Sequence, residues 1–253
     1  MDHEIKQHGK FKYVEAGEGE PLVLLHGLFG ALSNFQDLLD HFRTTHRVII
    51  PLLPLFELSL LETTVSGLAK HVRKFVEAMN LDKVHILGNS LGGHVGLVYA
   101  LNNLDKVKTI TLTGSSGLFE NGMGETYPKR GDREFIRRKT ELTFYDPKVA
   151  TKELVDEVFE IVNNRMKAIK IISLAKSAIR HNLGDELQDI KAPTCLIWGK
   201  NDTITPPMVA EEFHKLLPNS ELHWIDHCGH APMMEVPLEF NKILDDFLSR
   251  NSG

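Results

Sequence analysis

A single serine, Ser90, lies in the stretch GNSLGG (88–93), between a short apolar run and a helix-like pattern that begins near Leu91. Three interpretations are open: a phosphate-binding loop, a helix N-cap and a nucleophile. The phosphate loop fails on residue identity, because a dinucleotide fingerprint needs glycine where Ser90 stands and a Walker loop needs lysine where His94 stands. A cap needs only the serine. A tight strand-to-helix turn that presents a nucleophile also needs the small neighbours found here.

A serine hydroxyl becomes a good nucleophile only when a positioned base removes its proton, and histidine suits that task at neutral pH. The chain has 13 histidines, so position must select among them. His230, in the stretch DHCGHAP, follows the last predicted strand in a loop that Gly229 would allow to turn inward. His227, three residues earlier, is the alternative. His94 follows Ser90 in the predicted helix and is expected to be a packing residue.

The histidine in turn needs a carboxylate that orients it and stabilises its charged form. Asp202 follows another predicted strand, although an aspartate in the sequence KNDT also suits a turn. Asp226 is too close to His230 along the chain to fold back onto it easily, and Glu120 is a weaker candidate after an earlier strand. Asp202 precedes His230 by 28 residues. That length suffices for one helix and one strand, so both residues return to the same edge of a sheet.

Short apolar runs alternate with helix-length amphipathic stretches and supply the scaffold for these residues. The predicted strands cover residues 21–27, 46–50, 83–88, 107–114, 193–199 and 221–226. The predicted helices cover residues 31–42, 64–79, 91–102, 206–217 and 237–248. This alternation indicates an α/β fold, with a mostly parallel twisted sheet and helices on both faces.

One region, from about Leu118 to Glu186, has no convincing strand and three helical patterns. We therefore expect residues 118–186 to form a helical cap (lid) insertion, and residues 1–117 and 187–253 to form the core domain. The insertion is expected over the carboxyl edge of the sheet, where open α/β sheets bind their ligands.

The chain order Ser90, Asp202, His230 occurs together with HGLFG (26–30), GNSLGG, WGKNDTITPP and CGHAP. This set of motifs resembles the α/β-hydrolase superfamily over essentially the whole chain. The resemblance implies a serine nucleophile, a histidine base and an orienting aspartate at those three positions. It also implies a cap-domain protein similar to esterases and to carbon–carbon bond hydrolases.

A tetrahedral intermediate needs two backbone N–H donors aimed at its developing oxyanion. One donor is expected to be Leu91, directly after the serine at the helix N-terminus. The resemblance implies that the other is Leu28, with Phe29 as the alternative. Phe29 and His26 are the candidate residues of the substrate pocket, where the His26 side chain is expected to be structural.

Three stretches leave questions open. PLLPLFELSLL (51–61) lacks the aspartate and glycines that many relatives carry there, so it either packs a loop against the insertion or forms an apolar pocket wall. SNF (33–35) with GNS resembles the hydrolases of ring-cleavage dienones, but LFG (28–30) and Ala231 differ from their pattern. The basic segment PKRGDREFIRRK (128–139) is either a solvated helix face or the entrance of a carboxylate-binding pocket.

Composition and charge argue against other classes. The net charge of −5 offers no electrostatic reason to expect nucleic acid or a membrane as a partner. Two cysteines do not indicate a disulfide framework, and the histidines lack metal-ligand spacing. No secretory signal or bilayer-spanning segment is apparent. We therefore expect a cytoplasmic protein that acts on a small-molecule acyl substrate without metal or cofactor; whether it forms a homodimer is open.

The expected function is that of a serine hydrolase, which cleaves a small, largely apolar ester or related acyl compound through an acyl-enzyme. Carbon–carbon bond hydrolysis and cofactor-free perhydrolysis use the same three residues and are alternatives. A ligand-binding signalling module with a slow triad is an alternative from a different class, because a fold does not determine a function.

Overall fold

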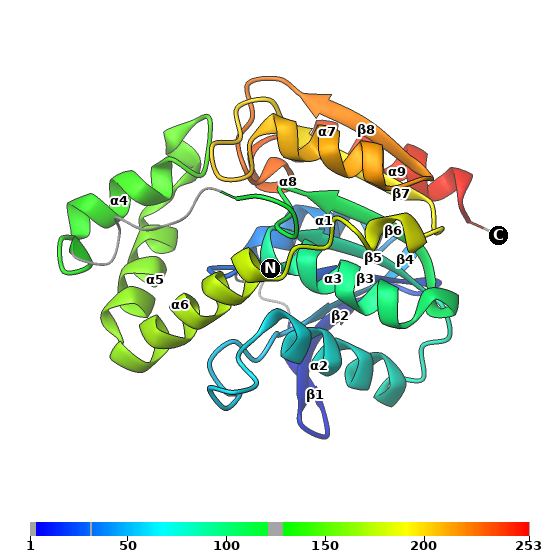
Figure 1. Cartoon of the computed structure of the whole chain (residues 1–253), viewed down its shortest axis with the longest axis horizontal. Coiled ribbons are helices and arrows are strands. Elements are labelled where there is room, and N and C mark those ends of the chain that lie inside the picture. Colours follow the sequence, from blue (N-terminus) through cyan, green and yellow to red (C-terminus); the bar gives the residue numbers. More distant parts are fainter. Residues whose placement is uncertain (1–3, 31, 121–128, 253) are drawn as a thin grey trace.

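The structure is a computed structural model that describes residues 4–30, 32–120 and 129–252. An eight-stranded sheet forms its centre, in the strand order β1-β2-β4-β3-β5-β6-β7-β8 (Figure 1). The strands are β1 (Lys6–His8), β2 (Phe11–Ala16), β3 (Glu20–Leu25), β4 (His46–Pro51), β5 (Val84–Asn89), β6 (Val107–Thr113), β7 (Thr194–Gly199) and β8 (Ser220–Ile225).

The strands β3 to β8 pair in parallel, which confirms the predicted mostly parallel sheet. The pairs β1–β2 and β2–β4 are antiparallel. They form an N-terminal hairpin extension that the sequence analysis did not predict. β1 is exposed at every position, so it carries no buried apolar pattern that would identify a strand.

The helices are α1 (Gln36–Phe42), α2 (Val65–Ala78), α3 (Leu91–Asn102), α4 (Arg133–Glu141), α5 (Lys152–Asn163), α6 (Arg165–Arg180), α7 (Pro207–Leu216), α8 (Pro232–Glu235) and α9 (Pro237–Arg250). Most predicted ends lie within about two residues of these bounds. The helix predicted over 31–42 was wrong in its first part, where a 3-10 helix spans Leu32–Phe35 before α1; residue 31 lies outside the described residues. Over the described ranges, no helix is long and apolar enough to cross a bilayer.

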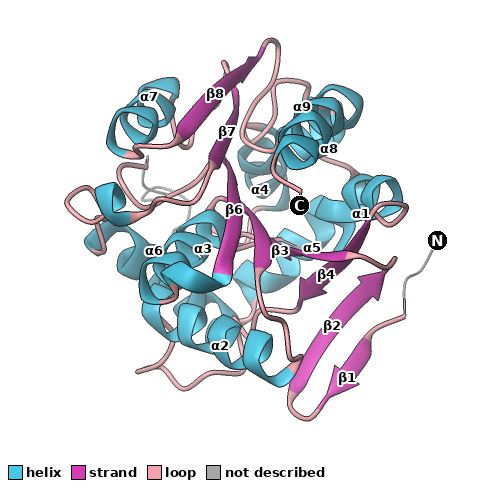
Figure 2. Cartoon of the chain, turned by 90° about the vertical axis from the view of Figure 1, so that its right-hand side faces the viewer, coloured by secondary structure: helices cyan, strands magenta, loops and turns pink. Residues whose placement is uncertain are grey.

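Side chains of the central strands alternate between two apolar layers. Leu22 and Leu24 of β3 belong to one layer, and Val23 and Leu25 belong to the other. The helices α1 and α9 cover the first layer, while α2, α3 and α7 cover the second (Figure 2). Alternation with a period of two is what a strand requires when both sheet faces are buried, so helices lie on both faces as predicted.

The helices α4, α5 and α6 lie together beside the α/β core (Figure 1). We refer to residues 118–186 as the helical insertion; residues 121–128 of it lie outside the described part of the chain. Lys170 of α6 donates hydrogen bonds of 2.6 Å to the backbone carbonyls of Phe56 and Leu58. These contacts support the interpretation that the stretch 51–61 packs against the insertion.

Candidate active site

Ser90 stands between β5, which ends at Asn89, and α3, which begins at Leu91. Its backbone has φ 55° and ψ −122°, a conformation that is costly for any residue other than glycine. Although it occupies the N-cap position, its side chain makes no capping hydrogen bond to the described helix. The cap interpretation therefore gives no reason for the serine, whereas a tight turn that presents the side chain does.

Glycines beside Ser90 allow backbones to approach more closely than a side chain would permit. A β-carbon on Gly92 would overlap the carbonyl oxygen of Leu25, at the end of β3. A β-carbon on Gly27 would lie 3.2 Å from Cβ of Ser90. The loop after β3 therefore passes directly beside the serine, as the oxyanion hypothesis requires.

Asp202 and His230 form a buried hydrogen-bonded pair. The carboxylate oxygen Oδ2 of Asp202 lies 2.9 Å from Nδ1 of His230, and the two side chains are 0% and 7% exposed. Thr205 Oγ1 also donates to Oδ2 at 2.8 Å, and the N–H groups of Ile204 and Thr205 donate to Oδ1 at 2.8 and 3.0 Å. Because an ionised carboxylate only accepts hydrogen bonds, Nδ1 of His230 carries the proton here and Nε2 is left as an acceptor.

The loop that carries His230 is attached to the ends of β5 and β6. Nδ2 of Asn89 donates to the backbone carbonyls of Thr113 and His230, each at 3.1 Å. Gly114 has φ +52°, and a β-carbon there would lie 2.7 Å from Nδ1 of His230. Since Asn89 directly precedes Ser90, the serine turn and the histidine loop share one edge of the sheet.

The alternative residues are oriented elsewhere. Asp226 pairs with Lys200 at 3.1 Å, and the His227 side chain is exposed. Glu120 lies near enough to His230 for the histidine's charge to lower its pKa, but burial is the larger effect and raises that pKa above the usual range. Among these candidates the structure brings only Asp202 into hydrogen-bond contact with His230.

The residues expected to donate to an oxyanion flank Ser90. Leu91 is buried and is the first residue of α3, so its N–H has no acceptor within the helix. Leu28 and Phe29 lie partly buried in the loop after β3. A hydrogen bond of 3.1 Å from the N–H of Gly30 to the carbonyl of Gly27 closes that turn.

The side chain of His26 connects two loops, and neither of its ring nitrogens is left to contact a substrate. Its Nδ1 lies 3.0 Å from the carbonyl of Gly27, and its Nε2 accepts the N–H of Leu53 at 3.1 Å. Burial lowers the pKa of His26, which keeps the ring neutral. These contacts agree with the structural role expected for the His26 side chain, because both ring nitrogens are used by the backbone.

A family model described as the alpha/beta hydrolase fold matches residues 20–142 and 157–237. The chain belongs to the alpha/beta hydrolase family. A solved structure of MGS-MChE2, an alpha/beta hydrolase enzyme from the sediment metagenome of the Mar Chica lagoon, Morocco, is 44% identical with a TM-score of 0.82. It covers 99% of this chain, which covers 100% of it.

Two curated relatives of this alpha/beta hydrolase have different named substrates. The chain is 25% identical to "Monoacylglycerol lipase abhd6-B" of Xenopus laevis, over 98% of this chain and 82% of that protein. It is 27% identical to "2-hydroxy-6-oxo-6-phenylhexa-2,4-dienoate hydrolase" of Burkholderia cepacia, over 93% of this chain and 90% of that protein. Family membership therefore leaves the substrate to be argued from the site.

Sequence reasoning missed two polar side chains that support the site of this alpha/beta hydrolase. Asn89 directly precedes the serine, and its amide reaches the histidine loop. Thr205 hydrogen-bonds Asp202 and lies 3.3 Å from Nδ1 of His230. The position of Thr205, three residues after an aspartate in a turn, was a usable signal. The contact of Asn89 was not, because its acceptor lies 141 residues away along the chain.

Two groups of side chains at the opposite, amino edge of the sheet place ligand-type atoms within 4.8 Å of one another: Glu20, His46 and His85, and Cys195, Glu221 and His223. The predicted absence of metal rested on sequence spacing, and the fold assembles these groups from distant strands. In each group the carboxylate already has a cationic partner. Lys108 donates to Glu20, and Arg250 donates to Glu221. We therefore assign no metal to either group.

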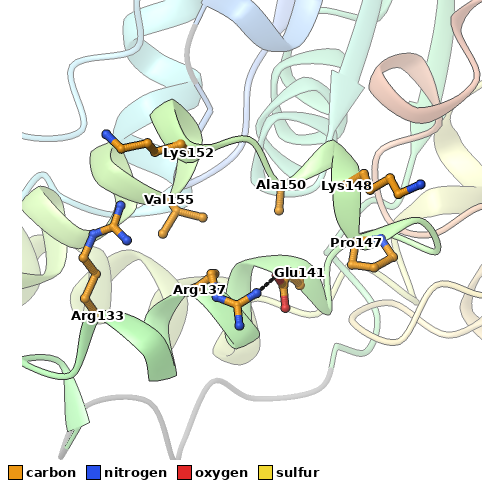
Figure 3. Close-up of a pocket in the computed structure, with 8 residues that line it drawn as sticks. All are labelled: Arg133, Arg137, Glu141, Pro147, Lys148, Ala150, Lys152 and Val155. Carbon is orange, nitrogen blue, oxygen red and sulfur yellow. Dashed lines mark hydrogen bonds and ion pairs between the residues drawn. The ribbon is translucent and has the colours of Figure 1, made fainter.

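A cavity of about 350 Å³ lies in the helical insertion and includes none of the serine, histidine and aspartate described above (Figure 3). Its lining consists of Arg133, Arg137, Glu141, Pro147, Lys148, Ala150, Lys152 and Val155. Arg133 pairs with Asp156 and Arg137 pairs with Glu141, on an exposed surface. These pairs favour a solvated helix face for the basic segment 128–139, whose first residue lies outside the described part.

Proposed function

We propose that this protein is a carboxylesterase-like serine hydrolase that cleaves a small, largely apolar ester or related acyl compound. The observation that carries the proposal is the buried 2.9 Å hydrogen bond between Asp202 and His230, at the sheet edge where Ser90 is held in a strained turn. A buried histidine–aspartate pair can be structural. A strained serine on the same edge makes no capping bond, so a role as nucleophile explains its strain better than a role as helix cap.

In the proposed reaction Ser90 Oγ attacks the acyl carbonyl while Nε2 of His230 takes the hydroxyl proton. Asp202 stabilises the imidazolium that forms. The N–H groups of Leu91 and Leu28 receive the developing oxyanion, and each such donor typically contributes about 3 kcal/mol to transition-state stabilisation. His230 then protonates the leaving alcohol, which leaves the acyl group on Ser90. A water molecule deprotonated by His230 attacks this ester, releases the acid and restores the serine.

Glu120 favours an uncharged substrate. Its carboxyl lies near His230, and burial, the larger effect, raises the pKa of Glu120 above its usual range. The surroundings of Glu120 therefore disfavour negative charge, and a substrate that brings its own carboxylate there would meet the same penalty. One relative's name, monoacylglycerol lipase, describes an uncharged ester and supports the same choice.

The test is turnover of p-nitrophenyl acetate, butyrate and octanoate by the wild type and by Ser90→Ala. We expect multiple turnovers by the wild type and a loss of at least about 10³-fold in kcat for the variant, since removal of the nucleophile leaves only binding and oxyanion stabilisation. Thermal unfolding of both proteins checks the fold. Full turnover by a folded Ser90→Ala variant would refute the mechanism.

Carbon–carbon bond hydrolysis is the second candidate, because the relative from Burkholderia cepacia is named for a dienoate and aligns over 93% of this chain. The dienoate carries a carboxylate, so the proposal about Glu120 predicts a lower kcat/KM for it than for p-nitrophenyl butyrate. The opposite ranking would favour this second candidate. A single burst of p-nitrophenol without further turnover would instead favour a ligand-binding module with a slow triad.

A further inference from the structure

A short segment of the helical insertion, residues 142–146, lies against the loops that carry Asp202 and His230. The N–H of His230 donates to the carbonyl of Thr143 at 2.8 Å. On the aspartate loop, Thr203 Oγ1 donates to the carbonyl of Leu142 at 3.1 Å. The insertion thus hydrogen-bonds directly to the backbone of the histidine itself.

Glu235, the last residue of α8, joins the same two parts of the chain. Its Oε1 accepts the N–H groups of Tyr145 and Asp146 at 2.7 and 2.9 Å. Its Oε2 accepts the N–H of Gly229 at 2.9 Å, directly before His230. A carboxylate is a strong acceptor for backbone N–H groups, and it is the shared partner of these three.

Gly229 is the residue that makes this contact sterically feasible. A β-carbon there would lie 2.6 Å from the carbonyl oxygen of Thr143, 2.9 Å from Cα of Phe144 and 2.9 Å from the nitrogen of Tyr145. An inward turn of the loop was the role expected for Gly229. Gly229 does not have a positive φ, whereas His227 has φ 50°. The glycine is therefore needed for close approach of the insertion and not for backbone freedom.

We propose that Glu235 is a positioning residue that clamps the segment 142–146 onto the histidine loop and thereby aligns His230 with Ser90. The inference rests on the proposed function. Asp202 orients the ring at Nδ1, but the position of the ring relative to the serine depends on the loop backbone. On the side of the insertion, that backbone is held by Thr143 and, through Gly229, by Glu235. On the core side, the amide of Asn89 holds the carbonyl of His230.

Misplacement of a catalytic group by about 1 Å can cost about 100-fold in rate. We therefore expect Glu235→Ala to lower kcat for p-nitrophenyl butyrate by about 10- to 100-fold, with KM changed less than about twofold because no substrate contact is removed. Glu235→Gln keeps one carbonyl oxygen as acceptor and should have an intermediate kcat. Gly229→Ala, which displaces the insertion from the other side, should lower kcat in the same way.

Matched controls separate positioning from a general loss of stability. Glu239→Ala removes an exposed carboxylate four residues later, and Gly131→Ala adds a β-carbon in open space. Both should keep wild-type kcat. The clamp is refuted if Glu235→Ala keeps kcat within about twofold of wild type, or if its loss appears in KM while kcat is unchanged. If Glu235→Ala does not fold, Glu235→Gln and Gly229→Ala decide by the same criteria.

Ser90→Ala distinguishes a failure of this clamp from a failure of the proposed function. If a folded Ser90→Ala variant turns over normally, the proposed function fails and the clamp fails with it. If Ser90→Ala is inactive while the Glu235 variants keep wild-type kcat, the function stands and only the clamp is wrong.

Discussion

Protonation of His94 at acid pH should lower the unfolding free energy, separately from any effect of acid on the reaction. His94 lies on α3, is fully buried, and stacks on His181 with ring centroids 5.3 Å apart. Burial first, and then the charge of His181, lower the pKa of His94 from 6.5 to about 3. The unfolded chain therefore takes up this proton first as pH falls. The stabilising effect is complete above the unfolded pKa and is lost progressively as pH falls toward the folded one.

The linkage relation gives the size of this loss. With an unfolded pKa of 6.5 and a folded pKa of about 3, this group alone removes about 2.5 kcal/mol of unfolding free energy between about pH 7 and about pH 4.5. Other buried histidines add to the total in the wild type. The contribution of His94 is therefore the difference in pH dependence between the wild type and His94→Asn, which cannot be protonated at these pH values.

Urea unfolding at the two pH values measures this difference. His94→Asn starts from a lower stability, because a buried ring is removed, but its unfolding free energy should fall about 2.5 kcal/mol less on acidification. His8→Asn, at an exposed position of β1, should retain the wild-type difference. If His94→Asn loses stability between the two pH values as steeply as the wild type, the assignment of a neutral buried His94 is wrong.

Three further predictions concern the site and its supports. Asp202→Asn should lower kcat by about 10³- to 10⁴-fold in steady-state ester hydrolysis, because the amide no longer stabilises the charged imidazole or selects its tautomer. Gly92→Ala should lower the unfolding free energy by several kcal/mol, seen as a lower urea midpoint, because its β-carbon would overlap the Leu25 carbonyl. Lys170→Met should lower the unfolding free energy by about 1–2 kcal/mol, measured by urea titration, because two hydrogen bonds to the stretch 51–61 are lost.

The grouping of the site residues was predictable from the sequence, because it follows from the direction of parallel strands alone. Parallel strands have their carboxyl ends at one edge of the sheet, so the residues that follow β5, β7 and β8 lie along the same edge. Ser90, Asp202 and His230 could be grouped on that basis, and the structure gives the hydrogen bond between the last two. Their catalytic roles stay predictions until the kinetics are measured.

Contacts set by the packing of the insertion were not predictable in this way. Nothing in the local sequence of Glu235 indicates that two of its hydrogen-bond donors, the N–H groups of Tyr145 and Asp146, lie about 90 residues earlier. The same limit explains Gly229, which was assigned to the wrong cause. A glycine in a loop permits either a special backbone angle or a close neighbour, and only the three-dimensional packing distinguishes them.

The attachments of the helical insertion bear on how a substrate reaches Ser90. Within the described residues it is tied to the core on two sides, through Lys170 on the stretch 51–61 and through Glu235 on the histidine loop. A rigid-body displacement of the insertion would break charge-assisted hydrogen bonds on both sides, and on the second side it would also break the bond from the N–H of His230 to the carbonyl of Thr143. On the proposed function, an insertion displaced in this way would leave His230 less well aligned with Ser90. Acyl groups that displace the insertion should then lower kcat as well as raise KM, which steady-state kinetics across acyl chain lengths would measure.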